Sequence, residues 1–522
     1  MKGNEFYSKA AWLCILGFTL FRFAYSGTFL LVPDEAYYWQ WSRHMAWGYH
    51  DHPPMISWAI KFATMILGHT EYAVRLPSVI LTGVASAYLV AIAQRWISPL
   101  AAFNTAILTQ SILGFNVGGI LATPDSLQAA TWAGACFHVA RAYEDGKLPN
   151  WLLGGAWFGF GMLSKYSMVI FLPGAFLFGI FSIKHRKRLT NLRPYTGGFL
   201  GTIIFLPVIL WNTENGWSTF RHAAYQGGVN QQLGINLKYF GEYLASQAGL
   251  LSPVVFLLVI FAWYLSLMKE SRDKNWILLY LFFTSFPVFA GFALLSLHTR
   301  IEGNWAGMGY LAASVLISGF ISHKPKKDQT HPMKLLSKKL WPWAIMSSYL
   351  ITALIMFHVL WPILPIPPRL DRISEETSGW RELGQQTAKI IKEMPNPNKT
   401  FLFGLRYQIA SELAFYSPEK PQTVSINRWN RPNAYDYWWD DEDFLGWDAV
   451  GIGSGSVKEI KRLGQAFEYV LPPEKIDIFR RPAIFGYGES NQPVAVFYLY
   501  RAFGFKGGLK WVPPDKSDIR AN

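Results

Sequence analysis

Long apolar runs separated by short polar segments recur along the first 362 residues of the chain. About 20 mostly apolar residues suffice for a helix to cross the hydrocarbon core of a bilayer. The pattern predicts about eleven such helices, the first serving as an uncleaved anchor because no small-residue cleavage site ends it. The predicted spans are 10–31, 76–95, 99–117, 124–141, 151–164, 166–183, 195–212, 248–268, 276–297, 305–322 and 341–362.

Beyond residue 362 the pattern changes to short strand-like runs and one amphipathic helix. The connector "WPILPIPPRLDR" is rich in proline, which resists helix formation. The runs "KTFLFGL", "PQTVSIN" and "VAVFYLY" predict strands, and "SGWRELGQQTAKIIKEM" predicts a helix. We therefore expect two domains, a membrane domain over 1–362 and a small α/β domain over 363–522, which is within normal domain size. The glycine-rich "GIGSGS" from Gly451 to Ser456 is interpreted as an ordinary turn.

Composition supports a polytopic membrane protein over a string of soluble domains. The chain is 51% hydrophobic and 16% aromatic but only 16% charged, whereas soluble domains carry about a quarter charged residues. Its two cysteines, Cys14 and Cys136, each lie inside an apolar run. This excludes a disulfide framework.

The basic residues gather in alternate loops, which predicts the orientation of the chain. The net charge of +14 could indicate nucleic-acid binding, but most of the excess falls in a few short segments. Loops on the cytoplasmic side are enriched in Lys and Arg, so we expect a cytoplasmic N-terminus, an outer first loop at 32–75, an outer C-terminal domain and no nucleic-acid partner. The basic segments are "MKGNEFYSK", "RAYEDGK", "KHRKRLTNLR", "KESRDK" and "HKPKKDQTHPMKLLSKK".

With this orientation the unusual polar residues all fall on the outer side of the membrane. A charge at the centre of a bilayer costs about 2.5–3.5 kcal/mol, so charges near the membrane tend to mark function. Acids and bases at one membrane edge predict a reaction site there. The candidates are Asp34, Glu35, Asp51, His52, Asp125, Lys165, Arg221, His222, Arg300 and Glu302.

The first outer loop is the densest of these segments. Its "AYYWQWSRHMAW" suits a helix lying in the interface with its rings at headgroup depth. The following "HPP" would end that helix, and "MISWAIKFATMIL" would form a second interfacial one. Asp34 and Asp51 would then lie beside the lipid surface. Asp34 could instead cap a helix, and Asp51 between His50 and His52 could bind a divalent metal ion.

Simpler interpretations remain open for the other candidates. Asp125 follows Pro124 as residues at helix starts do, and Lys165 could either extend toward the headgroups or contact a lipid phosphate. Arg300 with Glu302 could be a surface ion pair of little energetic worth. Arg221 and His222 lie in a long outer loop, where such residues occur by chance.

Six motifs, in their order along the chain and their common place on the outer side of the membrane, resemble those of a known family. They are "VPDEAYYW", "YHDHPPM", "EYAVRLPS", "LATPDSL", "MLSKY" and "EGNWAG". The chain resembles the C-type (GT-C) glycosyltransferases, in the bacterial branch related to protein O-mannosyltransferases and lipid A aminoarabinose transferases. The outer domain, with "GWRELG" and "RYQIASELAFYS", is similar to the tail of bacterial members of families 39 and 83.

The resemblance assigns roles residue by residue. Asp34 matches the catalytic acid of the first loop, and Asp51 matches a second acid that is glutamate in the aminoarabinose transferases and is linked there to a metal. The next position is lysine in those enzymes but His52 here, and histidine is only partly charged at neutral pH. His222 corresponds loosely to a metal-linked histidine. The remaining candidates would contact substrates: Glu35, His52, Asp125, Lys165, Arg300 and Glu302.

The resemblance implies an inner-membrane enzyme that takes a sugar from a polyprenyl-phosphate carrier on the periplasmic face. Lys165 and Arg300 would meet the phosphate charge that develops in the transition state, and Asp34 would act as general base on the acceptor hydroxyl. The acceptor would be lipid A, another lipopolysaccharide part, another glycan or a protein. A lipid or sugar flippase is the alternative, but transporters tend to contain repeats and to bind at the bilayer midplane, and the sequence shows neither feature.

Overall fold

The computed structural model of the protein describes residues 2–229, 234–268, 275–323, 331–455, 457–480 and 492–512. The chain forms two compact units. The first, called the helical unit, comprises Met1–Ser26, His52–Ile56 and Arg75–Ala353. The second, called the mixed unit, comprises Gly27–Asp51, Ser57–Val74 and Leu354–Asn522. The predicted boundary at residue 362 stays a prediction.

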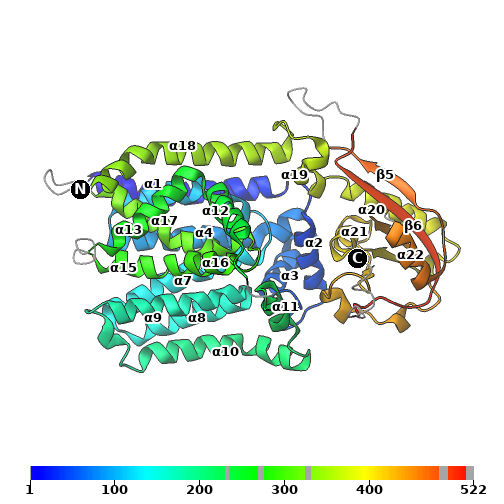
Figure 1. Ribbon diagram of the computed structural model, residues 1–522, viewed down its shortest axis with the longest axis horizontal. Helices are drawn as coiled ribbons and strands as arrows, with labels where there is room; N and C mark the ends of the chain where they lie inside the picture. Colours follow the sequence, from blue (N-terminus) through cyan, green and yellow to red (C-terminus); the bar gives the residue numbers. More distant parts are fainter. Residues whose placement is uncertain are drawn as a thin grey trace. The chain divides into compact units, whose positions relative to one another are not determined.

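The helical unit is built from long apolar helices (Figure 1). Each predicted span overlaps a helix or a pair of consecutive helices. The helices are α1 (Lys2–Ser26), α4 (Glu71–Trp96), α5 (Pro99–Ser111), α6 (Leu113–Gly118), α7 (Pro124–Asp145), α8 (Leu148–Ser164), α9 (Phe171–Phe181), α10 (Arg193–Glu214), α11 (Ser218–Gln226), α12 (Leu237–Leu251), α13 (Pro253–Leu267), α15 (Trp276–Phe283), α16 (Phe286–Ser296), α17 (Gly307–Ser322) and α18 (Pro332–Leu360), whose last residues belong to the mixed unit.

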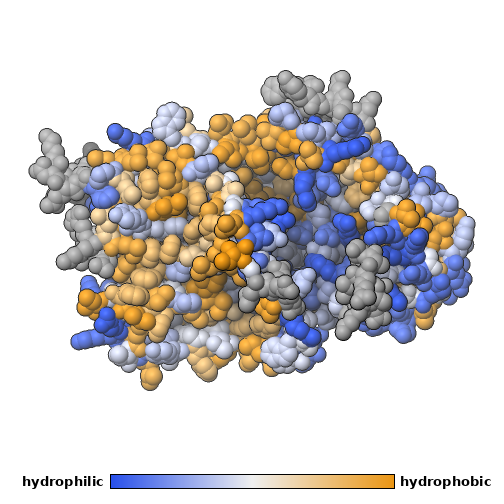
Figure 2. Space-filling view, in the orientation of Figure 1, coloured by the Kyte–Doolittle hydropathy of each residue, from blue (hydrophilic) through white to orange (hydrophobic). Residues whose placement is uncertain are grey.

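Five helical stretches in the described part of the chain are long and apolar enough to cross a membrane, or six if one bent pair counts as a span. The count of about eleven stays a prediction. Figure 2 shows apolar side chains gathered over α18 and over α13 and α15, as expected for surfaces that face lipid. The orientation also stays a prediction, because "KESRDK" and much of the last basic segment lie outside the described residues.

The span predicted at 248–268 is wrong as a single straight helix. α12 and α13 meet at a bend of 104°. Ser252, at the break, has a positive φ of 77°, and Pro253 opens α13. Proline has no backbone N–H to continue a helix, so α13 starts anew there, and the Ser252 hydroxyl accepts the backbone N–H of Val255 at 3.3 Å.

Glycines allow two helices of this unit to pack at van der Waals distance. Gly155 and Gly159 on α8 face Gly197 and Gly201 on α10. A Cβ at Gly155 would overlap the backbone carbonyl oxygen of Gly197. This small-xxx-small spacing on both helices is the usual way that membrane helices approach closely.

The mixed unit contains the predicted α/β domain, and the predicted strands and helix are confirmed. In the described part of this unit, six strands form one sheet in the order β2-β1-β3-β6-β4, with β5 also paired to β6. β1 pairs in parallel with β2 and β3, whereas the pairings of β6 are antiparallel. The elements are α2 (Pro33–Arg43), α3 (Met55–Leu67), α19 (Arg372–Glu376), α20 (Trp380–Glu393), β1 (Thr400–Gly404), α21 (Tyr407–Tyr416), β2 (Thr423–Ser425), β3 (Asp448–Gly453), α22 (Val457–Ala466), β4 (Phe467–Val470), β5 (Glu474–Ile478) and β6 (Ala495–Phe505).

Both faces of this sheet are buried. Along β1, Leu402 points into one apolar cluster and Phe401 and Phe403 into another, because successive side chains of a strand point to opposite faces. The first glycines of "GIGSGS" complete β3, and Gly455 follows with a positive φ. Ser456 lies outside the described residues.

Candidate functional site

Asp34 lies in the first turn of α2. The start of this helix is stabilised by the side chain of its neighbour, Glu35. The N-cap residue is Val32 and Pro33 takes the first helical position, as proline often does. The Glu35 carboxylate accepts the backbone N–H of Val32 at 3.0 Å. The interpretation of Asp34 as the cap is therefore wrong, because the buried Glu35 performs that role. A substrate contact by Glu35 stays a prediction.

Asp34 is an exposed residue, although much protein surrounds its carboxyl. The pKa of Asp34 is raised to about 6, first because desolvation disfavours the charged form, and then because Asp51 and Glu376 are negative; Arg431 opposes the shift. None of the described residues hydrogen-bonds to this carboxyl. A reachable carboxylate whose pKa lies near neutrality suits a general base.

Asp51 is fixed by a network from the C-terminal part of the mixed unit. Its Oδ1 accepts Arg431 Nη1 at 2.6 Å, and its Oδ2 accepts the Tyr37 hydroxyl at 2.7 Å. Arg431 also donates through Nη2 to the Tyr407 hydroxyl at 2.8 Å. The backbone N–H of Ala434 donates in turn to the Tyr37 hydroxyl at 2.7 Å. These bonds give Asp51 a defined position, and both Asp51 and the positively charged Arg431 act electrostatically on Asp34.

Sequence reasoning missed Arg431 and Tyr407. Both lie more than 350 residues from Asp51 along the chain, so no local spacing links them. The signal that could have found Arg431 is the aromatic density of "RWNRPNAYDYWW", which matches that of the first loop.

The rings of α2 lie inside the protein and do not face lipid, and their depth in the membrane stays a prediction. Tyr37 stacks on Tyr435 at a centroid distance of 6.2 Å, and Trp39 packs edge-on against Phe415 at 4.9 Å. The eight consecutive residues from Glu35 to Ser42 are all buried, so this stretch of α2 leaves no face that could lie on lipid. α3 does expose apolar side chains on one face, among them Phe62, Met65 and Ile66, as an interfacial helix would.

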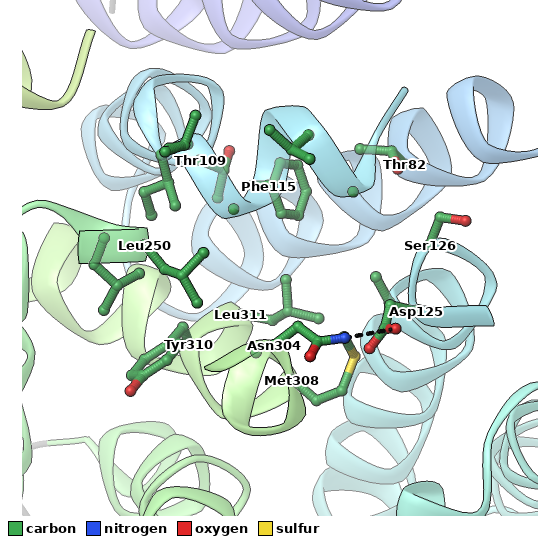
Figure 3. Close-up of a pocket in the computed structure, with 18 of the residues that line it drawn as sticks. Thr82, Thr109, Phe115, Asp125, Ser126, Leu250, Asn304, Met308, Tyr310 and Leu311 are labelled. Carbon is green, nitrogen blue, oxygen red and sulfur yellow. Dashed lines mark hydrogen bonds between the residues drawn. The ribbon is translucent and has the colours of Figure 1, made fainter. Parts of the chain in front are cut away.

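A second polar cluster lies in the helical unit and brings three of the motifs together. Lys165 Nζ donates to Asp125 Oδ1 at 2.7 Å. Asn304 Nδ2 donates to Asp125 Oδ2 at 3.1 Å (Figure 3). Asp125 is in the first turn of α7, as expected, and Lys165 directly follows the last residue of α8 as its C-cap. The motif "EGNWAG" thus reaches the site through Asn304, which sequence reasoning missed because it singled out Glu302.

An apolar cavity of about 340 Å³ opens beside this cluster. Asp125 and Asn304 lie at one end of the cavity, and Leu250, Leu311 and Phe115 line its walls (Figure 3). The walls favour a hydrocarbon ligand, and the polar end favours a headgroup that can bond to amide and ammonium donors.

The contacts described for the remaining candidates do not join them to the cluster of Asp34 and Asp51 or to the cluster of Asp125 and Lys165. Arg300 is largely exposed and lies 3.9 Å from Glu242, so the ion pair expected with Glu302 is wrong. Glu302 is exposed and precedes a short 3-10 helix, Gly303–Ala306. His52 and His222 are half-buried. Substrate roles for Arg300, Glu302 and His52 stay predictions.

The residues present do not fit a metal site at Asp51. No group of three or more His, Cys, Asp or Glu side chains in the described part of the chain could hold a metal ion. One oxygen of Asp51 is also occupied by the Arg431 guanidinium, whose charge repels a metal cation. The metal role of Asp51 and His222 therefore stays a prediction without support from the geometry.

Comparison with known proteins agrees with the residue pattern. The model of the family described as "Dolichyl-phosphate-mannose-protein mannosyltransferase" matches residues 51–211. The chain is 26% identical over 312 residues to the lipid A galacturonosyltransferase RgtD of Rhizobium johnstonii, covering 59% of this chain and 64% of that protein. It is 27% identical over 199 residues to an undecaprenyl phosphate-alpha-4-amino-4-deoxy-L-arabinose arabinosyl transferase of Pseudomonas savastanoi, covering 35% of this chain and 36% of that protein.

The fold is that of a solved membrane protein over nearly the whole chain. ArnT from Cupriavidus metallidurans in the apo state superposes with a TM-score of 0.60 at 14% identity, covering 94% of this chain and 97% of that one. The same protein bound to undecaprenyl phosphate gives a TM-score of 0.57 at 13% identity, with the same coverage. The chain spans less than two thirds of the length of the curated relatives it matches. Its motifs, its fold and these matches all indicate similarity to the C-type glycosyltransferases.

Proposed function

We propose that the protein transfers a sugar from an undecaprenyl-type polyprenyl phosphate to lipid A or another part of lipopolysaccharide. The reaction would take place on the periplasmic face of the bacterial inner membrane. The printed activities of the two curated relatives support this proposal, since one acts on lipid A and the other uses undecaprenyl phosphate. The observation that carries it is Asp34, a solvent-reachable carboxyl with a raised pKa beside the held Asp51.

In this reaction the acceptor hydroxyl attacks the anomeric carbon of the carrier-bound sugar. Asp34 takes the hydroxyl proton while the bond from the anomeric carbon to the phosphate oxygen breaks, and the electron pair leaves with the polyprenyl phosphate. One base and no protein nucleophile imply inversion at that carbon. Asp51, fixed by Arg431 and Tyr37, adjusts the basicity of Asp34 through its charge.

The second cluster would receive the carrier. The apolar cavity suits the start of a polyprenyl chain, and Lys165 supplies positive charge for the phosphate. In the free protein Asp125 neutralises this lysine. A phosphate with its own negative charge would compete with Asp125 for the ammonium group, which makes the site selective for the charged headgroup over a neutral lipid.

The test compares envelope lipids from cells that lack the protein with those from cells that carry wild-type protein or Asp34→Asn. Mass spectrometry of lipid A and lipopolysaccharide should show a sugar mass only with the wild-type protein. Glu375→Gln, an exposed carboxyl of the same unit, is the matched control and should restore the mass. Transfer by Asp34→Asn at the wild-type level would remove Asp34 from the mechanism, and no mass difference in any lipid fraction would refute the proposed acceptor.

A further inference from the structure

A small polar cleft in the mixed unit is separate from both clusters described above. Its volume is about 160 Å³. It is formed where the residues preceding α2, the end of α18 and the segment before α20 come together. Thr28, Leu360, Ser378, Arg381 and Arg480 are among its lining residues, and no Asp or Glu is among the described residues that line it.

Arg480 has guanidinium donors that the described residues leave without an acceptor. Its side chain is only 5% exposed. Nη1 donates to Asp371 Oδ2 at 2.7 Å and to the carbonyl oxygen of Ile366 at 3.2 Å. Nε and Nη2 are buried and have no hydrogen-bond partner in the described part of the chain. A buried charged donor without an acceptor is costly, so these donors favour a partner that enters the cleft, such as water, an ion or a ligand headgroup.

Asp371 cannot supply the missing acceptor, because its oxygens are already used. Oδ1 accepts the backbone N–H of Ser374 at 3.1 Å and lies 3.3 Å from His358 Nε2. Oδ2 accepts the Ser374 hydroxyl at 2.7 Å as well as Arg480 Nη1. The other donors of Arg480 therefore remain available to a group that enters the cleft.

The start of α20 adds further donors to the same cleft. Ser378 and Arg381 line the cleft on either side of Gly379, the N-cap of this 14-residue helix. Glycine has no side chain that could accept the N–H groups of the first turn, which have no partner within a helix. The positive end of the helix dipole attracts anions at this position. Arg381, paired with Glu71 at 2.5 Å, adds a second guanidinium.

The cleft also contacts the end of a membrane-crossing helix. Val359 and Leu360 line it. They are the last two residues of α18, which is long and apolar enough to span a bilayer. The end of such a helix lies at the level of the lipid headgroups. The anions that are abundant there are lipid phosphates.

We propose that this cleft binds the phosphate of an anionic lipid headgroup, held by Arg480, Arg381 and the first turn of α20. The bound lipid ties the mixed unit to the membrane surface at the end of α18. The site needs no sugar donor and no turnover, so it stands or falls independently of the transferase activity.

Binding is measured on the full chain, purified in detergent and freed of lipid, by isothermal titration calorimetry. The probes are dioctanoyl phosphatidic acid, dioctanoylglycerol as its uncharged analogue, and inorganic phosphate. Wild-type protein should bind the phosphatidic acid at least tenfold more tightly than either other probe. Arg480→Gln should weaken this binding at least tenfold and Arg381→Gln severalfold. Arg372→Gln should stay within twofold of wild type, because Arg372 is exposed and does not line the cleft.

Two further variants keep the outcome interpretable. Arg480→Gln also removes the partner of the buried Asp371, so Ser378→Phe, which fills the cleft and leaves the pair of Arg480 and Asp371 in place, should lose binding equally. Asp34→Asn should bind like wild type although it would not transfer sugar. Wild-type binding by both Arg480→Gln and Ser378→Phe overturns the site, and equal affinity for inorganic phosphate overturns the assignment to a lipid.

Discussion

Acidification from pH 7 to pH 5 should slow sugar transfer by the wild-type protein about tenfold. A base works only in its ionised form. With a pKa of about 6 for Asp34, the ionised fraction falls from about nine tenths at pH 7 to about one tenth at pH 5. A carboxyl with the ordinary value of 3.8 would lose less than about a tenth of its ionised form over the same range.

The fall in transfer rate on the acidic side of the pH–rate profile is called the acidic limb. Two substitutions should move this limb along the pH axis in opposite directions. Arg431 lowers the pKa of Asp34 and Asp51 raises it. Arg431→Gln should therefore shift the limb to higher pH, and Asp51→Asn should shift it to lower pH. Arg501→Gln removes a positive charge that pairs with Glu474 and does not contribute to the pKa of Asp34, so its limb should coincide with that of wild type.

The assay is the initial transfer rate of purified protein at saturating donor and acceptor, from pH 4.5 to pH 8. Stability gives an independent control. Because the pKa of Asp34 in the folded protein lies above that of an unfolded chain, the folded state binds more protons between about pH 4 and pH 6, and the stability that Asp34 contributes falls as pH rises through this window. Asp34→Asn should thus melt no lower than wild type at pH 7. An acidic limb near pH 4, or shifts of the same sign in both variants, would refute the role given to Asp34.

Three other substitutions test the packing and the second cluster. Gly155→Ala on α8 should clearly lower the thermal unfolding temperature in detergent, because the new methyl group meets the backbone of Gly197 on α10. Gly198→Ala, also on α10, meets nothing within 4 Å and should leave that temperature unchanged. Tyr37→Phe should cost about 1–3 kcal/mol in chemical unfolding, since it leaves the buried Ala434 N–H without its acceptor, and Tyr469→Phe, at an exposed ring, should cost nothing measurable. Lys165→Met should raise the KM for the polyprenyl-phosphate donor more than tenfold, because it removes the ammonium group proposed to meet the phosphate, and should destabilise the protein, because it leaves the largely buried Asp125 carboxylate without its cation. Equal KM values in wild type and Lys165→Met would contradict a phosphate contact.

The local sequence determined where the helices and strands lie. Runs of apolar residues located α4, α10 and α17, because a helix satisfies its backbone hydrogen bonds among near neighbours. The alternation in "KTFLFGL" located β1, because successive side chains of a strand point to opposite faces, but its partners β2 and β3 come from elsewhere in the chain. The break between α12 and α13 was also written locally, in Pro253. It was missed because hydropathy averages over about 20 residues and is insensitive to one missing N–H.

The sequence also indicated which residue types carry the chemistry, but only the tertiary structure decided how they are used. The spacing of Asp34 and Glu35 does not say which carboxylate caps α2, and the fold gives that bond to Glu35. Nothing near Asp51 foretells Arg431, 380 residues away, and nothing in "EGNWAG" selects Asn304 over Glu302. Burial decided whether the rings of α2 face lipid or protein. The physical reason is that helix formation depends on neighbours within four residues, whereas a charge, a pKa or a buried ring depends on whatever the folded chain brings within a few ångströms.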